Sequence, residues 1–183
     1  MPINAQLLDN PKSDRVRRIA DLTRTKRRRK SGRFLIEGPQ SVREAIRYAS
    51  DVITDIYVAG DEDGIDSDVL ADIAQRAIDA STDLYVHTAT REVIDHISPD
   101  AQGIIAVGET DKLRAGMDAK VENATGRPKG MRVAAFWQVR DPGNAGTVIR
   151  AADAAGCDVV VFVDDCVDML NPKVIRSTTG SLF

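Results

Sequence analysis

Two polar side chains near the middle of the C-terminal third could bind a phosphate. Asn144 and Arg150 lie in and just beyond the turn-like sequence Asp-Pro-Gly-Asn-Ala-Gly at 141–146. N–H groups at a helix start attract anions, and an arginine offers a permanently charged planar fork. Gly143 and Gly146 would let the backbone approach such a ligand closely. A simple Pro-Gly turn with an Asn cap and a surface arginine would give the same sequence.

The first 33 residues are strongly basic and predict contacts with a polyanion. They contain eleven Lys or Arg and three Asp, whereas the whole chain has a net charge of −3. Cationic side chains placed on phosphates release counterions and strengthen binding without reading base sequence. A solvated basic helix or a localisation-type tail remains the alternative. The candidate residues for binding a nucleic acid are Lys12, Arg15, Arg18, Arg24, Lys26, Arg27, Arg28, Arg29, Lys30 and Arg33.

Other classes of site have weaker support. No signal peptide or apolar stretch of membrane-spanning length is present, so we expect a cytoplasmic protein without membrane contact. Cys157 and Cys166 have no metal-ligand spacing with His87 or His96, which predicts buried structural thiols and no metal. An oxidoreductase-type dinucleotide fold is also disfavoured, because the loop at 141–146 lacks the G-x-G start, even though acidic residues follow the next strand.

The hydrophobic pattern predicts an α/β fold in two parts. The basic head, 1–33, reads as one short amphipathic helix whose end frays into the arginine run, followed by strands alternating with helices over 34–108. Ser41 and Glu44 suggest a capping box at the first of these helices. Residues 109–130 are polar, contain three glycines and a proline, and resemble a linker.

The last part, 131–183, begins as a βαβ unit. Residues 132–139 and 158–163 read as strands, and a helix with small apolar residues lies between them. Two strands and one helix cannot cover their own apolar faces. We therefore expect either another chain to complete this sheet or the polypeptide to be partial.

The residues at 141–156 carry a family resemblance. Their pattern N-x-G-x-x-x-R, before a helix of small residues, resembles the first signature of the SpoU/TrmH family of RNA ribose 2′-O-methyltransferases. Upstream, Asn10-Pro11-Lys12, the sequence FLIEGP at 34–39, VREA at 42–45 and QGIIA at 102–106 resemble that family's N-terminal substrate domain. The likeness covers nearly the whole chain in order.

The resemblance implies a fold, a cofactor and a reaction. The fold would be a small α/β RNA-substrate-binding domain followed by a trefoil-knotted SPOUT methyltransferase domain, acting as a homodimer on ribosomal or transfer RNA with S-adenosylmethionine. Asn144 and Arg150 would be the family's conserved asparagine and catalytic arginine. Because arginine stays protonated, we expect Arg150 to grip the RNA phosphate and orient the ribose hydroxyl, with Asn144 holding the loop or the ribose.

The C-terminal end departs from the family pattern. Two further signatures, a glycine-and-glutamate loop and a serine-leucine-asparagine helix that form the methyl-donor pocket, do not follow residue 183. The resemblance therefore predicts an incomplete SPOUT domain over 131–183 that binds S-adenosylmethionine weakly or not at all. The alternative is a non-catalytic RNA-binding module made by the first 108 residues.

Overall fold

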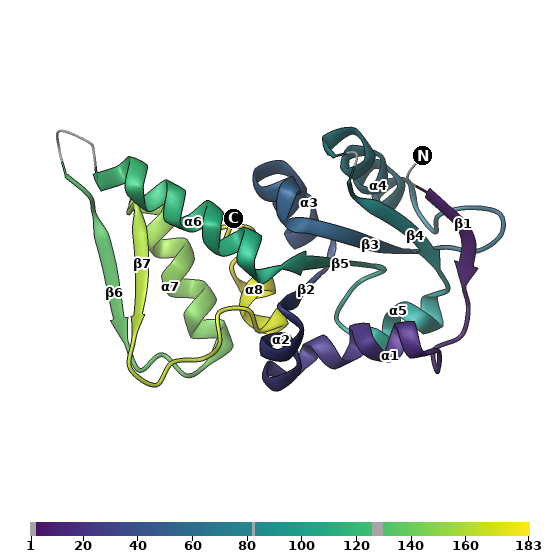
Figure 1. Cartoon of the computed structure of the whole chain (residues 1–183), viewed down its shortest axis with the longest axis horizontal. Helices are drawn as coiled ribbons and strands as arrows, with labels where there is room; N and C mark the ends of the chain where they lie inside the picture. The colour runs from purple at the N-terminus through teal and green to yellow at the C-terminus, as the bar shows by residue number, and fades with distance from the viewer. Residues whose placement is uncertain (1–2, 82, 126–129) are drawn as a thin grey trace.

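The computed structural model describes residues 3–81, 83–125 and 130–183. Figure 1 shows a larger α/β unit joined to a smaller one, with the long helix α6 (Thr110–Thr125) and the short helix α8 (Pro172–Ser177) between them. The predicted α/β fold class is confirmed.

The larger unit is built on one five-stranded sheet in the order β1-β4-β3-β5-β2. β1, β4 and β3 run parallel, whereas β5 is antiparallel to both β3 and β2. The strands are β1 (Ile3–Leu8), β2 (Arg33–Glu37), β3 (Ile53–Ala59), β4 (Tyr85–Ala89) and β5 (Ile104–Glu109).

Helices cover both faces of this sheet (Figure 1). Double coverage explains why β2 and β5 are nearly continuous apolar runs rather than alternating ones. One face carries α3 (Pro39–Ala49) and α4 (Asp68–Ala80), with the 3-10 turn η2 (Ser50–Val52) after α3. The other face carries α1 (Asp14–Ala20), the 3-10 turn η1 (Asp21–Thr23), α2 (Thr25–Ser31) and α5 (Arg91–Ile97).

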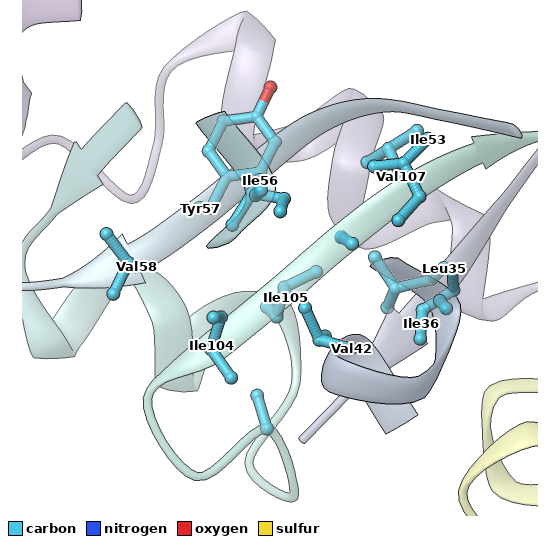
Figure 2. Close-up of a cluster of buried hydrophobic side chains, with 14 of the residues drawn as sticks. Leu35, Ile36, Val42, Ile53, Ile56, Tyr57, Val58, Ile104, Ile105 and Val107 are labelled. Carbon is cyan, nitrogen blue, oxygen red and sulfur yellow. The ribbon is translucent and has the colours of Figure 1, made fainter. Parts of the chain in front are cut away.

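The core lies where β2, β3 and β5 meet. Figure 2 shows this cluster, in which Leu35, Ile56 and Ile105 are completely buried. Tyr57 belongs to the same cluster and is 3% exposed, but its hydroxyl points away from the apolar side chains (Figure 2). The polar end of this tyrosine therefore reaches the layer of α1 and α2, where a cationic side chain meets it.

The smaller unit is the predicted βαβ motif. β6 (Val133–Trp137) and β7 (Val159–Val163) pair in parallel, and α7 (Pro142–Ala154) connects them. Gly156 ends the helical segment with a positive φ of 67°, a conformation that glycine adopts without strain. The small apolar residues of α7 pack against one face of the strand pair.

Helix α8 belongs to both units. It packs against α7, while its Ile175 lies in the core of the larger unit and is completely buried. A side chain at Gly180 would collide with Glu44 of α3, so the chain after α8 also lies directly against the larger unit. The two units thus share one small helix.

Three local predictions need correction in the basic head and its surroundings. The head contains a strand, β1, which was not predicted. It also has two helices instead of one, because Arg24 is extended and acts as the N-cap of α2. The arginine run is therefore helical rather than frayed. The predicted capping box of Ser41 and Glu44 is absent, because Gly38 is the N-cap of α3 and Ser41 is buried inside it.

The segment expected to be an irregular linker is largely helical. α6 occupies 110–125, and residues 126–129 of the predicted linker lie outside the described residues. Leu113 anchors the first turns with 6% exposure, and the Lys120 ammonium donates to the carbonyl of Phe183 at 2.6 Å. The remaining division into four segments stays a prediction.

The predictions about cysteines, metals and membranes have separate outcomes. Cys157 and Cys166 are free thiols and half-buried rather than buried. Among the described residues, no three His, Cys, Asp or Glu side chains form a group that could hold a metal ion. None of the described helices is long and apolar enough to cross a bilayer.

Candidate functional site

The predicted phosphate loop is the first turn of α7. The Asp141 carboxylate is the N-cap and accepts a hydrogen bond from the backbone N–H of Asn144 at 2.8 Å. Pro142 takes the first helical position, where a missing N–H costs nothing. The expected tight loop at 141–146 is therefore corrected to a capped helix start, with the Asn144 side chain exposed on it.

Arg150 lies further along α7, six residues beyond Asn144. The Thr147 hydroxyl donates to the carbonyl of Gly143 at 3.0 Å and lies 3.5 Å from Nη2 of Arg150. The other terminal nitrogen, Nη1, donates to the carbonyl of Ser177 in α8. These contacts account for two of the five N–H groups of the guanidinium, which is exposed. The structure therefore places Asn144 and Arg150 on one helix, and their predicted joint role stays a prediction.

Gly146 serves α8 rather than a ligand. A Cβ at this position would lie within 2.5 Å of the carbonyl carbon and Cβ of Ser177. The Ser177 hydroxyl in turn donates to the carbonyl of Pro142 at 2.8 Å. Our expectation that Gly146 admits a ligand is thus corrected, because α8 occupies the space. Thr147 and Ser177 were missed as site residues. Thr147 lies one turn before Arg150 on α7, so the i, i+3 spacing in the sequence could have found it. Only the packing of α8 against α7 brings Ser177 to Arg150.

α8 also connects this corner to the larger unit through an ion pair. Nη1 of Arg176 lies 2.8 Å from Oε1 of Glu37 and 2.8 Å from Oδ2 of Asp100. The Glu37 side chain is 3% exposed, and its other oxygen accepts from the Ser98 hydroxyl at 2.6 Å. A guanidinium and a hydroxyl placed in this way satisfy the hydrogen-bonding needs of the buried carboxylate. Successive residues of α8 therefore contact the corner and the end of β2.

Most predicted RNA-binding residues lie on the surface of α1, α2 and the flanking turns. Arg24 and Arg27 are exposed and both lie near Asp21, at 3.5 and 3.2 Å. Exposed ion pairs of this kind contribute little to stability, so both arginines remain able to bind a phosphate. The exposed members of the set are Lys12, Arg18, Arg24, Lys26, Arg27, Arg29, Lys30 and Arg33.

Arg28 is a correction to that set. Its side chain is 2% exposed, and Nη1 donates to the carbonyls of Leu22 and Thr23 at 2.9 Å. Nη2 donates to the Thr25 hydroxyl and to Oδ2 of Asp168 at 2.6 Å. A guanidinium engaged in this way is a structural group between the units, so Arg28 does not face RNA.

Arg15 is half-buried in a polar cluster that the sequence did not reveal. Its guanidinium donates to the Tyr57 hydroxyl, and Nη2 lies 2.7 Å from Nε2 of His87. That same His87 nitrogen is 2.9 Å from Oδ1 of Asp55. Burial would raise the pKa of Asp55, but hydrogen bonds from His87 and Thr54 and the nearby positive charges outweigh it and lower the pKa. Asp55 is thus an ionised acceptor.

The cluster also keeps its tyrosine neutral. Burial, followed by the charge of Asp55, raises the pKa of Tyr57 above 10.0, although Arg15 opposes this shift. The ring of Tyr57 stacks on that of His87 with centroids 4.9 Å apart. The pairing of β3 with β4 makes Asp55, Tyr57 and His87 neighbours, and Arg15 reaches them from α1.

The carboxyl ends of β6 and β7 are the place where an α/β sheet binds a cofactor. There, the Gln138 amide donates to Asp164 at 2.7 Å, and Arg140 pairs with Asp165 at 3.3 Å. Arg140, Asp164 and Asp165 are all exposed. The described residues at this edge offer no buried polar group for a molecule of the size of S-adenosylmethionine. By themselves they do not fit that cofactor.

Two family models match the chain. The model of the SpoU rRNA Methylase family matches residues 131–183, and the MRM3-like substrate binding domain matches residues 13–106, which is half of the chain. This chain belongs to the SpoU methylase family. The SpoU resemblance seen in the sequence is thereby confirmed, and it extends to the substrate-binding part.

Curated relatives of this SpoU protein are named as rRNA methyltransferases. The 23S rRNA (guanosine(2553)-2′-O)-methyltransferase RlmP of Bacillus subtilis is 33% identical over 178 residues, which cover 96% of this chain and 62% of RlmP. The human mitochondrial rRNA methyltransferase 3 is 49% identical over 45 residues, 25% of this chain and 11% of that protein. The SpoU chain thus spans about 62% of the length of RlmP.

Solved SpoU-type structures share the fold. An RNA 2′-O ribose methyltransferase superposes with a TM-score of 0.70 and 26% identity, over 97% of this chain and 62% of that one. The SpoU methyltransferase AviRb of Streptomyces viridochromogenes, in complex with AdoMet, gives a TM-score of 0.72 at 19% identity, over 93% and 60% of the two chains. The latter identity shows only the fold.

Proposed function

We propose that this SpoU protein is part of an enzyme that methylates the 2′-hydroxyl of a ribose in ribosomal RNA with S-adenosylmethionine. Its 183 residues supply the RNA-binding unit and the first part of the catalytic unit. The observation that carries the proposal is the position of Arg150 in the third turn of α7, where its guanidinium contacts Thr147 of the same helix and Ser177 of α8. The naming of RlmP and that of the RNA 2′-O ribose methyltransferase structure at 26% identity support the same reaction.

Arg150 acts as a positioning cation in this proposal. An arginine stays protonated in a protein and is a poor base, but its planar fork can hold a phosphate in two hydrogen bonds. With two N–H groups bound to protein, its orientation is set before RNA arrives. A ribose hydroxyl adjacent to the held phosphate is thereby oriented for in-line attack on a methyl group. Asn144, exposed on the first turn of the same helix, contacts the ribose or the neighbouring phosphate.

S-adenosylmethionine, when bound, supplies the electrophilic methyl group. Because the edge formed by β6 and β7 does not enclose a ligand, we propose that these 183 residues bind the cofactor weakly or not at all. Isothermal titration of the chain with S-adenosylmethionine tests this, and micromolar affinity would overturn it.

The proposed reaction is tested by methyl transfer to ribosomal RNA. The whole protein is incubated with unmethylated ribosomal RNA and tritiated S-adenosylmethionine, and the labelled RNA is hydrolysed with alkali. A 2′-O-methyl group blocks cleavage at its own nucleotide, so label in alkali-resistant dinucleotides is expected. Label released as mononucleotides would indicate base methylation and contradict the proposal.

A non-catalytic RNA-binding module is the second candidate. It is favoured by the larger unit, which has its own buried core and the exposed basic residues of α1 and α2. RNA binding with no methyl transfer by the whole protein would favour it. A homodimer and a cytoplasmic location stay predictions, and sedimentation and cell fractionation test them.

A further inference from the structure

A cavity of about 410 Å³ lies between the basic helices and the sheet of the larger unit. Its walls come from α1, η1 and α2 on one side and from β3 and β5 on the other. This volume falls in the range of small-ligand sites, about 300–1,000 Å³. The methyl transfer proposed above does not use the interior of this cavity, which lies in a different unit from Arg150.

The cavity has an apolar wall beside a polar one. Ile19, Leu22 and Val107 line it and are nearly completely buried. Asp55 and Tyr57 also line it, the first as an ionised acceptor and the second as a neutral phenol. A flat aromatic heterocycle that carries N–H groups has matching chemistry, since it can lie against the apolar wall and donate to the carboxylate.

Cations surround the opening of the same cavity. Arg18, Arg27, Lys30 and Arg33 line it and are all exposed. Arg27 is held at 3.2 Å from Asp21, whereas Lys30 and Arg33 follow at the end of α2 and the start of β2. A phosphate attached to a ligand inside the cavity would meet these side chains.

We infer that this cavity binds one unpaired nucleotide of the RNA, with the base inside and its phosphates on the basic rim. The inference rests on the proposed function, in which RNA is the partner. It adds the requirement that the RNA be single-stranded or bulged where it meets the cavity. A base stacked and paired inside an RNA duplex could not enter, because its neighbours and its pairing partner cover it. Reading unpaired bases in this way is common in RNA recognition.

The test compares two hairpin RNAs that differ by one bulged nucleotide. Affinities of the 183-residue chain for both are measured by fluorescence anisotropy at the same salt concentration, and 2-aminopurine at the bulge reports whether that base is enclosed. We expect the bulged RNA to bind at least tenfold more tightly, with a change in 2-aminopurine emission. Equal affinities and an unchanged emission would overturn the inference while leaving RNA binding intact.

Substitutions at the cavity separate base enclosure from general charge. Ser31 lines the cavity at the end of α2 and is exposed, so Ser31→Trp blocks the opening with no change of charge. We expect it to reduce the preference for the bulge to less than twofold and to leave the affinity for the paired hairpin within twofold. If Ser31→Trp disturbs the fold, Tyr57→Phe provides a milder variant with the same expected direction. An unchanged preference in both folded variants would overturn the inference.

Matched double variants control for charge. Arg18→Ala with Arg33→Ala removes two rim cations, and Lys26→Ala with Arg29→Ala removes two cations of α2 that do not line the cavity. The first double variant should reduce the preference for the bulged RNA, whereas the second should lower the affinity for both RNAs equally. Equal effects of the two pairs would contradict a specific pocket. Loss of all RNA binding in the unmodified chain would instead contradict the proposed function.

A free nucleotide has the same chemistry and is the remaining alternative. Adenosine 5′-monophosphate and guanosine 5′-monophosphate are therefore added as competitors to the bulged complex. We expect half-displacement only at millimolar concentrations, because the surrounding RNA contributes most of the phosphate contacts. Displacement at micromolar concentrations would show a site for a free nucleotide and overturn the assignment to RNA.

Discussion

Nη2 of Arg28 lies 2.6 Å from Oδ2 of Asp168 and joins the basic helix α2 to the loop before α8. The Arg28 side chain is 2% exposed and the Asp168 side chain 24% exposed. Together with the pair of Arg176 and Glu37, this contact fixes α8 against the larger unit. Because Ser177 of α8 also contacts Arg150, the candidate catalytic arginine is held at a set position relative to the RNA-binding surface.

Asp168→Asn should destabilise the chain by about 1–3 kcal/mol, because it leaves the buried charge of Arg28 without its anion. Urea unfolding followed by circular dichroism measures the change. Asp165→Asn is the control, since Asp165 pairs with Arg140 at 3.3 Å on the surface and should change stability by less than about 0.5 kcal/mol. Equal effects of the two substitutions would contradict a structural role for the Arg28 contact.

Stability should fall in acid partly through Asp168. Burial would raise its pKa, but hydrogen bonds from Arg28 and from the Leu170 amide, with the Arg28 charge, lower it below 3.8 in the folded chain. The unfolded chain therefore takes up this proton first as the pH falls. The contribution is complete above about pH 4–5 and is lost as the pH drops through the folded pKa. Asp168→Asn should flatten the acid side of the stability curve, and an unaltered slope would contradict this assignment.

Gly146→Ala should separate α7 from α8. The added methyl group would collide with the backbone of Ser177, so we expect a loss of about 1–3 kcal/mol, as for overpacking. Gly116→Ala is the matched control, because nothing lies within 4 Å of a Cβ there and alanine favours the helix by about 0.5–1 kcal/mol. Thermal unfolding of both variants measures the difference. A stable Gly146→Ala protein would mean that the helices are not in close contact.

RNA affinity should depend steeply on salt through the basic helix α2. Each phosphate contact of a single strand contributes about 0.7 to the slope of log K against log salt, and each duplex contact about 0.9. Replacing Lys26, Arg29 and Lys30 by Ala should therefore lower the slope by about 2. Replacing Arg43, Arg47 and Arg76, which lie on α3 and α4 across the sheet, should leave it unchanged. A flat salt response of the unmodified chain would exclude phosphate contacts by this surface.

The sequence predicted the elements whose hydrophobic pattern is strong and local. The strands at 34–36, 55–58 and 158–163 and the helices of the larger unit agree with the structure apart from their ends. β1 was missed because an edge strand of six residues gains its stability from pairing with β4, which is about eighty residues away. α6 was missed because its polar sequence has a weak apolar stripe, with Leu113 as its buried anchor.

The candidate site was predictable only in part. The motif identified Asn144 and Arg150, which the structure places in the first and third turns of one helix, α7. Ser177 and Asp168 could not be found in this way, since they reach the site through tertiary packing. From the sequence, Arg28 was grouped with the surface cations. Its burial and its ion pair with Asp168 depend on tertiary packing, which the local sequence does not show.

The central claim is that Arg150 aligns the RNA for methyl transfer. The most direct measurement compares Arg150→Ala with the unmodified whole protein in single-turnover methylation of ribosomal RNA, at RNA and cofactor concentrations that saturate both proteins. We expect the rate to fall by about 100-fold, in the range for loss of one preorganised charged donor, while RNA affinity falls by less than tenfold. A rate within twofold of the unmodified protein, at unchanged RNA affinity, would contradict the role assigned to Arg150.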